Sequence, residues 1–219
     1  MNKKMKDYEN NSFLKWLDNF WYHNKAAVII GAFAIILVSF ATVQFFSKKE
    51  PDVFIYSVGS SGISAKAAEE FRADLAEKFA SDYNGDGRVV VDLKSDSFVM
   101  TESANGKKYV YDPQSQMTEV QRFNMELAMG ECVVYIMEPG FFSGNTPYMA
   151  SLEDVLGYTP ENSVQGKGMV IGDLIAYNTT KLGHFPREYI ICIVEKNKRF
   201  GDEYYKGNAE FFKNLIEYR

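Results

Sequence analysis

Histidine and cysteine are scarce in this sequence, which contains two residues of each among 219. His23 and His184 cannot supply a histidine-rich metal cluster, and neither stands in a recognisable pattern with a nucleophile and a base. No spacing in the chain assembles the parts of a catalytic site. The sequence therefore predicts a protein that is not an enzyme.

The two cysteines, Cys132 and Cys192, each lie in an apolar run rich in β-branched residues, and neither belongs to a CxxC or Cys/His pattern. Their placement excludes the common zinc and thiol redox motifs. Two interpretations stay open. The cysteines are either buried small side chains, or they form one disulfide between two strands, which an oxidising exterior would permit.

Basic residues are in deficit over most of the chain. Residues from Glu50 onward include 17 basic and 26 acidic side chains, a net charge of −9. Residues 1–25 include five lysines and three acidic side chains, a net charge of +2. Because nucleic acid needs clustered Lys and Arg against its phosphates, we expect no nucleic acid partner for the acidic part.

One long stretch lacks charge altogether. From Ala26 to Ser47 the chain has 22 uncharged, mostly apolar residues, and about 20 are enough to cross the hydrocarbon core of a bilayer. A secretory signal is the alternative, but its apolar region is usually only about 7–15 residues long and ends at small residues. Here the stretch ends in the bulky run VQFF. The sequence therefore predicts an uncleaved transmembrane helix at 26–47.

Lysines flank this predicted span unequally. Lys6, Lys15 and Lys25 precede it, with two more lysines further toward the N-terminus, and Lys48 and Lys49 follow it. Since Lys and Arg are retained on the cytoplasmic side, we expect a single-pass protein of the plasma membrane. Residues 1–25 would then be a cytoplasmic tail, and residues 48–219 an extracytoplasmic domain.

The tail contains an amphipathic helix pattern. Its apolar residues recur at i, i+1, i+4, i+7 and i+8, and they are Phe13, Leu14, Leu17, Phe20 and Trp21. Aromatic residues next to a span fit the headgroup layer, and nearby lysines attract anionic lipids. The segment is expected to lie on the inner membrane surface. Docking against a helix of a partner protein is the alternative.

The remainder predicts one α/β domain with a mixed sheet. A strand at 52–58, a glycine-rich turn, a helix from Ser64 to Tyr83 and a strand at 88–93 form a β-α-β unit, which usually has parallel strands. An Asn105-Gly106 hairpin follows. The later elements are expected to be a helix at 115–130, a strand at 132–137, a helix at 152–156, a strand or strand pair at 168–177, a strand at 189–194 and a helix at 202–218.

The turn after the first helix matches the DxNxDG opening of calcium loops, with oxygen ligands at positions 1, 3 and 5 and a glycine at position 6. The candidate metal residues are Asp82, Asn84, Asp86, Arg88 and Asp92. Position 12, which normally closes the shell with a carboxylate, is Leu93, and a strand follows where an EF-hand has a helix. The alternative is an ordinary turn, because Asn, Asp and Gly are the usual turn residues. Calcium is the one cofactor that the sequence suggests.

Two loops are candidates for ligand contact. Gly59, Ser60, Ser61 and Gly62 lie between a strand and a helix, where free backbone N–H groups can receive an anion. Their spacing matches neither the dinucleotide nor the P-loop fingerprint. The second candidate is the loop after strand 132–137, which contains Glu138, Pro139 and the aromatic pair Phe141-Phe142. For that loop, ordinary packing is the alternative.

The order of these elements resembles a known family. The strand VFIYSV, the glycine turn, the long helix, the strand RVVVDL and the later passage MELAMGECVVYIM are similar to the first lobe of bacterial extracytoplasmic solute-binding proteins. The resemblance covers residues 52–140 and implies that the strand opened by GECVVYIM borders a ligand cleft. The chain departs from the family because its outer part is too short for two lobes and because it has a predicted transmembrane helix.

Two functions from different classes follow from these observations. In the first, the outer domain is a membrane-anchored binding or sensing module for a small-molecule ligand. In the second, the chain is an accessory or structural subunit that packs against other membrane proteins. In both, the lipid bilayer is a partner.

Overall fold

The computed structural model describes residues 12–47, 50–98, 100–102, 109–111 and 117–219. The chain divides into two compact units, Met1–Lys49 and Glu50–Arg219.

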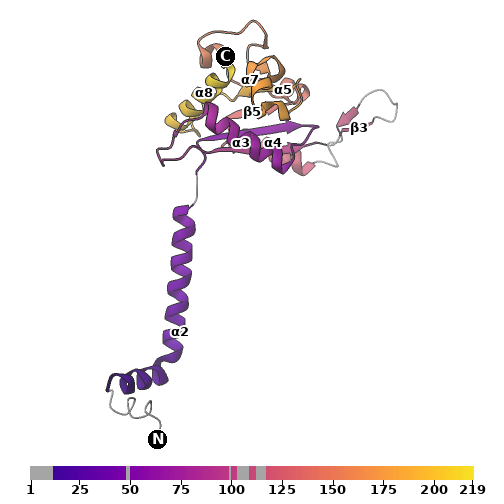
Figure 1. Cartoon of the computed structure of the whole chain (residues 1–219). Helices are drawn as coiled ribbons and strands as arrows, with labels where there is room; N and C mark the ends of the chain where they lie inside the picture. The colour runs from indigo at the N-terminus through magenta and orange to yellow at the C-terminus, as the bar shows by residue number, and fades with distance from the viewer. Residues whose placement is uncertain (1–11, 48–49, 99, 103–108, 112–116) are drawn as a thin grey trace. The chain divides into compact units, whose positions relative to one another are not determined.

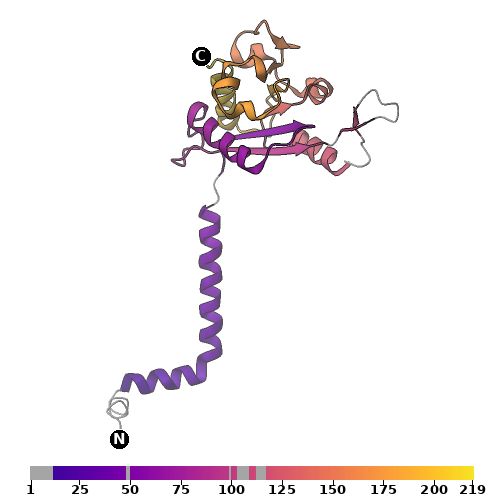
Figure 2. The same ribbon diagram turned by 45° about the vertical axis from the view of Figure 1, so that its right-hand side comes forward.

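The described part of the first unit is a single helix, α2 (Ser12–Ser47). Among the described residues it is the one helix long and apolar enough to cross a membrane, with a mean hydropathy of 2.6 and no buried residues in its most apolar window. The amphipathic segment and the apolar stretch are continuous in α2, and Figure 2 shows that the ribbon changes direction toward its N-terminal end. Phe13, Trp16 and Phe20 stack along the helix, with ring centroids 6.0 and 5.5 Å apart.

The second unit is built on a mixed sheet of six strands in the order β2-β1-β5-β8-β7-β6 (Figure 1). Strand β1 pairs in parallel with both β2 and β5, and the three remaining pairings are antiparallel. The predicted mixed α/β fold and its parallel β-α-β start are confirmed. The bounds are β1 (Val53–Gly59), β2 (Val91–Ser97), β5 (Val134–Met137), β6 (Ser163–Val164), β7 (Gly168–Val170) and β8 (Ile190–Ile193).

The central strands are buried on both faces, which explains their nearly continuous apolar sequence. Helix α3 (Ala65–Phe79) connects β1 to β2, and helix α4 (Met117–Met129) precedes β5 on the other side of β1. Right-handed crossovers that run in opposite directions place their helices on opposite faces of a sheet. In agreement, Tyr56 packs on Phe123 of α4, whereas α3 packs on helix α8 (Asp202–Ile216) through Phe79 and Phe211.

Shorter elements complete the unit. Strands β3 and β4 pair in antiparallel, as the hairpin pattern predicts, and the Ala104-Asn105-Gly106 turn lies outside the described residues. The bounds of these two strands are β3 (Met100–Glu102) and β4 (Tyr109–Tyr111). The other short elements lie between β5 and β8 in the sequence. They are α5 (Pro139–Asn145), η1 (Thr146–Tyr148), α6 (Leu152–Leu156), η2 (Ile171–Asp173), α7 (Ile175–Thr179) and η3 (Lys181–His184).

Two predicted elements were wrong in part. The strand or strand pair at 168–177 is a strand only to Val170 and then becomes helical. The chain turns there because Gly172 approaches Arg187 so closely that a Cβ atom would lie 2.6 Å from the Arg187 carbonyl. The first long helix ends at Phe79, not Tyr83, since the backbone beyond it is bound by other elements. At the end of the helix itself, the Asn214 amide donates to the Phe79 carbonyl.

The cysteines are both free and buried. Cys192 on β8 lies opposite Tyr135, three positions along the chain from Cys132. In an extended strand that interval places side chains on opposite faces and about 10 Å apart along the strand. The disulfide interpretation is therefore wrong. Burial raises the pKa of both thiols, so they are neutral apolar packing groups.

One buried carboxylate joins the start of β1 to the segment before β2. Asp52 is 1% exposed. Its Oδ1 accepts hydrogen bonds from the backbone N–H groups of Tyr83 and Asn84, and its Oδ2 accepts from Val90. The Asp52 carbonyl also accepts from the Asn208 amide of α8. A buried carboxylate is costly unless it is hydrogen-bonded. The hydrogen bonds of Asp52 satisfy it and connect the start of β1, the segment before β2 and helix α8.

Replacement of Asp52 by alanine is expected to lower the free energy of unfolding by about 3 kcal/mol, because buried N–H groups lose a charged acceptor. The measurement is urea unfolding of the full chain in detergent, followed by circular dichroism. Asp173→Ala removes an exposed aspartate and should change the free energy of unfolding by less than about 0.5 kcal/mol. Equal midpoints for Asp52→Ala and wild type would contradict the assignment.

Candidate functional site

The carboxyl ends of β1 and β5 form the topological switch point of the sheet. From β1 the chain crosses through α3 to β2 on one side, and it returns through α4 to β5 on the other. In open α/β sheets, ligands bind outside the carboxyl ends of strands at such a point. The candidate loop 59–62 follows β1 here, and Glu138 follows β5 directly.

Two side chains from distant parts of the sequence contact the loop. The Ser60 N–H donates to Glu138 Oε2 at 2.7 Å, and the Ser61 N–H donates to the Tyr189 hydroxyl at 3.0 Å. Gly59 makes this arrangement possible, since a Cβ atom there would lie 2.1 Å from the Tyr189 hydroxyl oxygen. Ser60, Ser61 and Gly62 are exposed, whereas Tyr189 is buried.

These contacts change the chemistry predicted for the loop. Two of the N–H groups expected to receive an external anion, those of Ser60 and Ser61, are already engaged by acceptors of the protein itself. Glu138 Oε1 accepts no hydrogen bond from any described residue and is half-buried. The edge therefore offers a fixed carboxylate oxygen, which suits a ligand that donates hydrogen bonds, such as an amine or a hydroxyl.

The aromatic pair lies in a helix, so the prediction of a loop at this place was wrong. Pro139 stands at the start of α5, where proline is favoured, and the Phe142 N–H donates to the Glu138 carbonyl as the first helical bond. Phe142 is fully buried in the core. Phe141 is half-buried and packs on Phe98, with ring centroids 4.7 Å apart. Both phenylalanines therefore stabilise the carboxyl edge of the sheet by packing.

A polar network that the sequence analysis missed lies beside this edge. Asp96 of β2 is 6% exposed and accepts hydrogen bonds from the Tyr56 hydroxyl and the Arg122 guanidinium, whose Nε lies 3.0 Å from Oδ2. Burial raises the pKa of Tyr56, and its hydrogen bond to Asp96 raises it further. Tyr56 is therefore a neutral donor. The buried Tyr56–Asp96 pair connects β1 to β2, and the more exposed Arg122 side chain connects α4 to Asp96.

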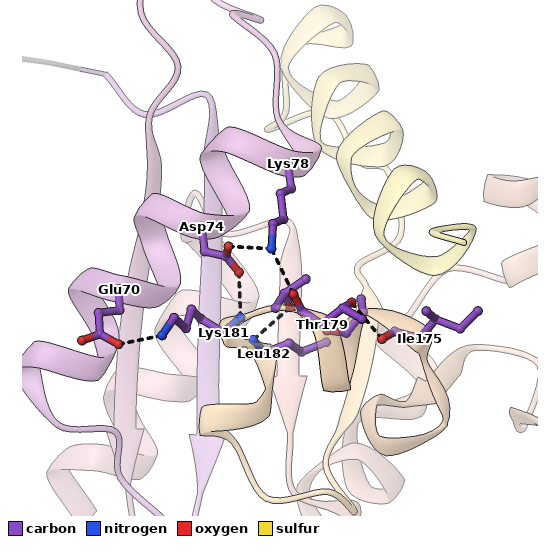
Figure 3. Close-up of polar contacts among 9 residues, drawn as sticks. Glu70, Asp74, Lys78, Ile175, Thr179, Lys181 and Leu182 are labelled. Carbon is purple, nitrogen blue, oxygen red and sulfur yellow. Dashed lines mark hydrogen bonds and ion pairs between the residues drawn. The ribbon is translucent and has the colours of Figure 1, made fainter.

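Two acidic residues of α3, Glu70 and Asp74, are engaged in a second network (Figure 3). Glu70 lies 3.1 Å from the Lys181 ammonium group, and Asp74 accepts from the Lys181 backbone N–H at 2.7 Å and from Lys78 at 2.8 Å. Lys78 also donates to the Thr179 carbonyl. These contacts fasten α7 and η3 to α3, and the Lys181 contact lowers the pKa of Glu70. This network of side chains therefore stabilises the fold.

The turn with the calcium-like pattern lies at the opposite edge of the sheet. It precedes β2, whose first residue pairs with Val53, whereas loop 59–62 lies at the Gly59–Ser97 end. Asp82 Oδ1 accepts from the N–H groups of Gly85 and Asp86, and Oδ2 accepts from Gly87. The structure therefore does not bring the two candidate sites together.

The remaining members of the predicted metal set differ in position. Asn84 Oδ1 accepts from the Asp86 N–H, and Asp86 Oδ1 accepts from the Arg88 N–H. Asp92 lies on β2, and its Oδ1 accepts from Arg72 of α3 at 3.3 Å. No group of three or more His, Cys, Asp or Glu side chains in the described part of the chain is arranged to hold a metal ion. The calcium site stays a prediction.

Calcium binding can be tested by thermal unfolding. If Kd is about 10⁻⁴ to 10⁻³ M, as in extracellular modules, calcium at ten times Kd stabilises the folded domain by about 1.4 kcal/mol. Asp86→Asn should abolish the rise in melting temperature, because the amide keeps an acceptor for the Arg88 N–H but removes the charge. Magnesium is the control cation, since it demands stricter octahedral geometry. An unchanged melting temperature up to about 10 mM calcium would leave the segment an ordinary turn.

Comparison with known proteins returned no relative: no protein-family model, no curated protein and no solved structure matches this chain.

Proposed function

We propose that the chain is a membrane-anchored binding or sensing module that holds a small ligand at the carboxyl edge of β1 and β5. The observation that carries the proposal is the contact between Ser60 and Glu138 at the switch point of the sheet. Two loops that are 78 residues apart in sequence meet there on parallel strands. In α/β domains this position is the one from which ligands are usually held.

The proposed ligand is a small molecule with an amine or hydroxyl donor. Glu138 would accept from it through Oε1, while Oε2 is fixed by the Ser60 N–H at 2.7 Å. A carboxylate that is already oriented loses less freedom on binding, which favours affinity. The acidic composition of residues 50–219 would also attract cationic ligands. The family resemblance of residues 52–140 supports the same class of function.

Glu138→Ala is expected to remove the ligand that co-purifies with the protein. The full chain is purified in detergent from the membranes of its own cells, and small molecules released by denaturation are measured by mass spectrometry. Loss of a charge-assisted hydrogen bond should lower ligand recovery about tenfold or more. Glu161→Ala, which removes an exposed glutamate away from the edge, should retain the ligand.

The second candidate function is an accessory subunit, and the exposed methionines of α4 favour it. Met117, Met125 and Met129 lie on one side of the helix and are 59%, 59% and 72% exposed. Flexible methionine side chains are common on protein-binding surfaces. A wild-type preparation that contains a stoichiometric polypeptide and no small molecule would support this function against the first.

We also propose that α2 places residues 1–25 in the cytoplasm and residues 48–219 outside the plasma membrane. The length and composition of the helix support a span, and the distribution of flanking lysines supports the orientation.

A protease added to intact cells or spheroplasts should digest the domain and spare a tag at the N-terminus. The readout is immunoblotting for tags at both ends, with detergent-lysed cells as the control in which both are digested. A protected C-terminal tag would reverse the orientation, and a mature protein that begins near residue 47 would indicate a cleaved signal.

A further inference from the structure

A polar hollow on α2 lies directly before the uncharged stretch. It is shallow and open to solvent, and all six of its lining residues are exposed. Most of its lining residues recur at intervals of three or four, so they share one side of the helix. The lining residues are Lys15, Asp18, Asn19, Trp21, Tyr22 and Lys25.

The lining is rich in hydrogen-bond donors. Two lysines supply ammonium groups, Asn19 supplies an amide, and Trp21 supplies an indole N–H. Asp18 is the one acidic group among the six lining residues, so they carry a net charge of +1. Lysine is a common binder of phosphate. The chemistry therefore fits a phosphate ester better than a cation or an apolar ligand.

The position of the hollow in the sequence indicates which kind of phosphate ester it would bind. Lys25 is the last charged residue before the 22 uncharged residues that begin at Ala26. Basic and aromatic side chains at the end of a span lie at the level of the lipid headgroups. At that depth the abundant phosphate esters are phospholipids. The exposed stack of Phe13, Trp16 and Phe20 on the same segment offers apolar surface for acyl chains.

We propose that this hollow binds the phosphate of an anionic phospholipid headgroup. Lys15 and Lys25 contact the phosphate, and the donors of Asn19 and Trp21 complete the site. The inference rests on the proposed membrane placement and is independent of ligand binding at the carboxyl edge of the sheet. The site would hold the N-terminal segment of α2 at the membrane surface.

The sequence contains only two tryptophans, and both are in α2. The variant Trp16→Phe therefore leaves Trp21, which lines the hollow, as the sole tryptophan reporter. The full chain is reconstituted in vesicles that contain phosphatidylglycerol and phosphatidylcholine at one fixed ratio. In one series the phosphatidylglycerol carries brominated acyl chains, and in the other the phosphatidylcholine does. Bromine quenches tryptophan on contact, so the two series report which lipid lies beside Trp21.

Brominated phosphatidylglycerol is expected to quench more strongly per mole than brominated phosphatidylcholine. Lys15→Gln with Lys25→Gln should lower this preference about 25-fold, since each lysine near an anionic surface contributes about fivefold. The matched control is Lys4→Gln with Lys6→Gln, which removes the same charge from the same tail at positions further in sequence from the apolar stretch. This control should retain most of the preference.

Other results would overturn the inference. Equal quenching by both lipids leaves the membrane placement intact and refutes the lipid site. No quenching by either lipid refutes the membrane placement and the site together. An equal loss of preference in the two lysine pairs assigns the effect to general charge in the tail. Loss of the preference on addition of soluble glycerol phosphate assigns the hollow to free phosphate esters instead of lipid.

Discussion

The domain formed by Glu50–Arg219 depends on the carboxylate of Asp52. Asp52 is buried near the start of this domain, and it accepts three backbone hydrogen bonds from the segment between α3 and β2. Because the next residue, Val53, begins β1 and pairs with Val91, the first residue of β2, these bonds hold the two strands together where their pairing begins. The Asn208 amide donates to the Asp52 carbonyl and brings the C-terminal helix to the same point.

This constraint links the two edges of the sheet. At the amino edge, Asp52 and Asp82 arrange backbone N–H groups into a turn that contains two glycines with positive φ, Gly85 and Gly87. At the carboxyl edge, seven residues further along β1, the chain opens into the 59–62 loop. Carboxylates hold backbone donors at both edges, which is a common way to order loops that carry polar groups without a ligand.

The two candidate binding regions differ in the charge of the groups they present. The carboxyl edge of the sheet presents a carboxylate oxygen of Glu138, whereas the hollow on α2 presents two lysines. Their opposite charge agrees with the division of the whole sequence, which is basic before the apolar stretch and acidic after it. An acidic domain and a basic segment before an apolar helix are each suited to partners of the opposite sign.

The sequence by itself determined the apolar helix, the β-α-β start and most later elements, because hydrophobic periodicity and turn residues are local signals. It also identified the 59–62 loop, since glycines between a strand and a helix are recognisable. Only the tertiary structure decided which groups meet that loop: Glu138 and Tyr189 are 78 and 128 residues away from their partners. The helical fate of residues 171–179 was likewise decided by a close approach to Arg187. Contacts between distant segments leave no pattern in a single sequence, because either partner alone is an ordinary glutamate, tyrosine or arginine.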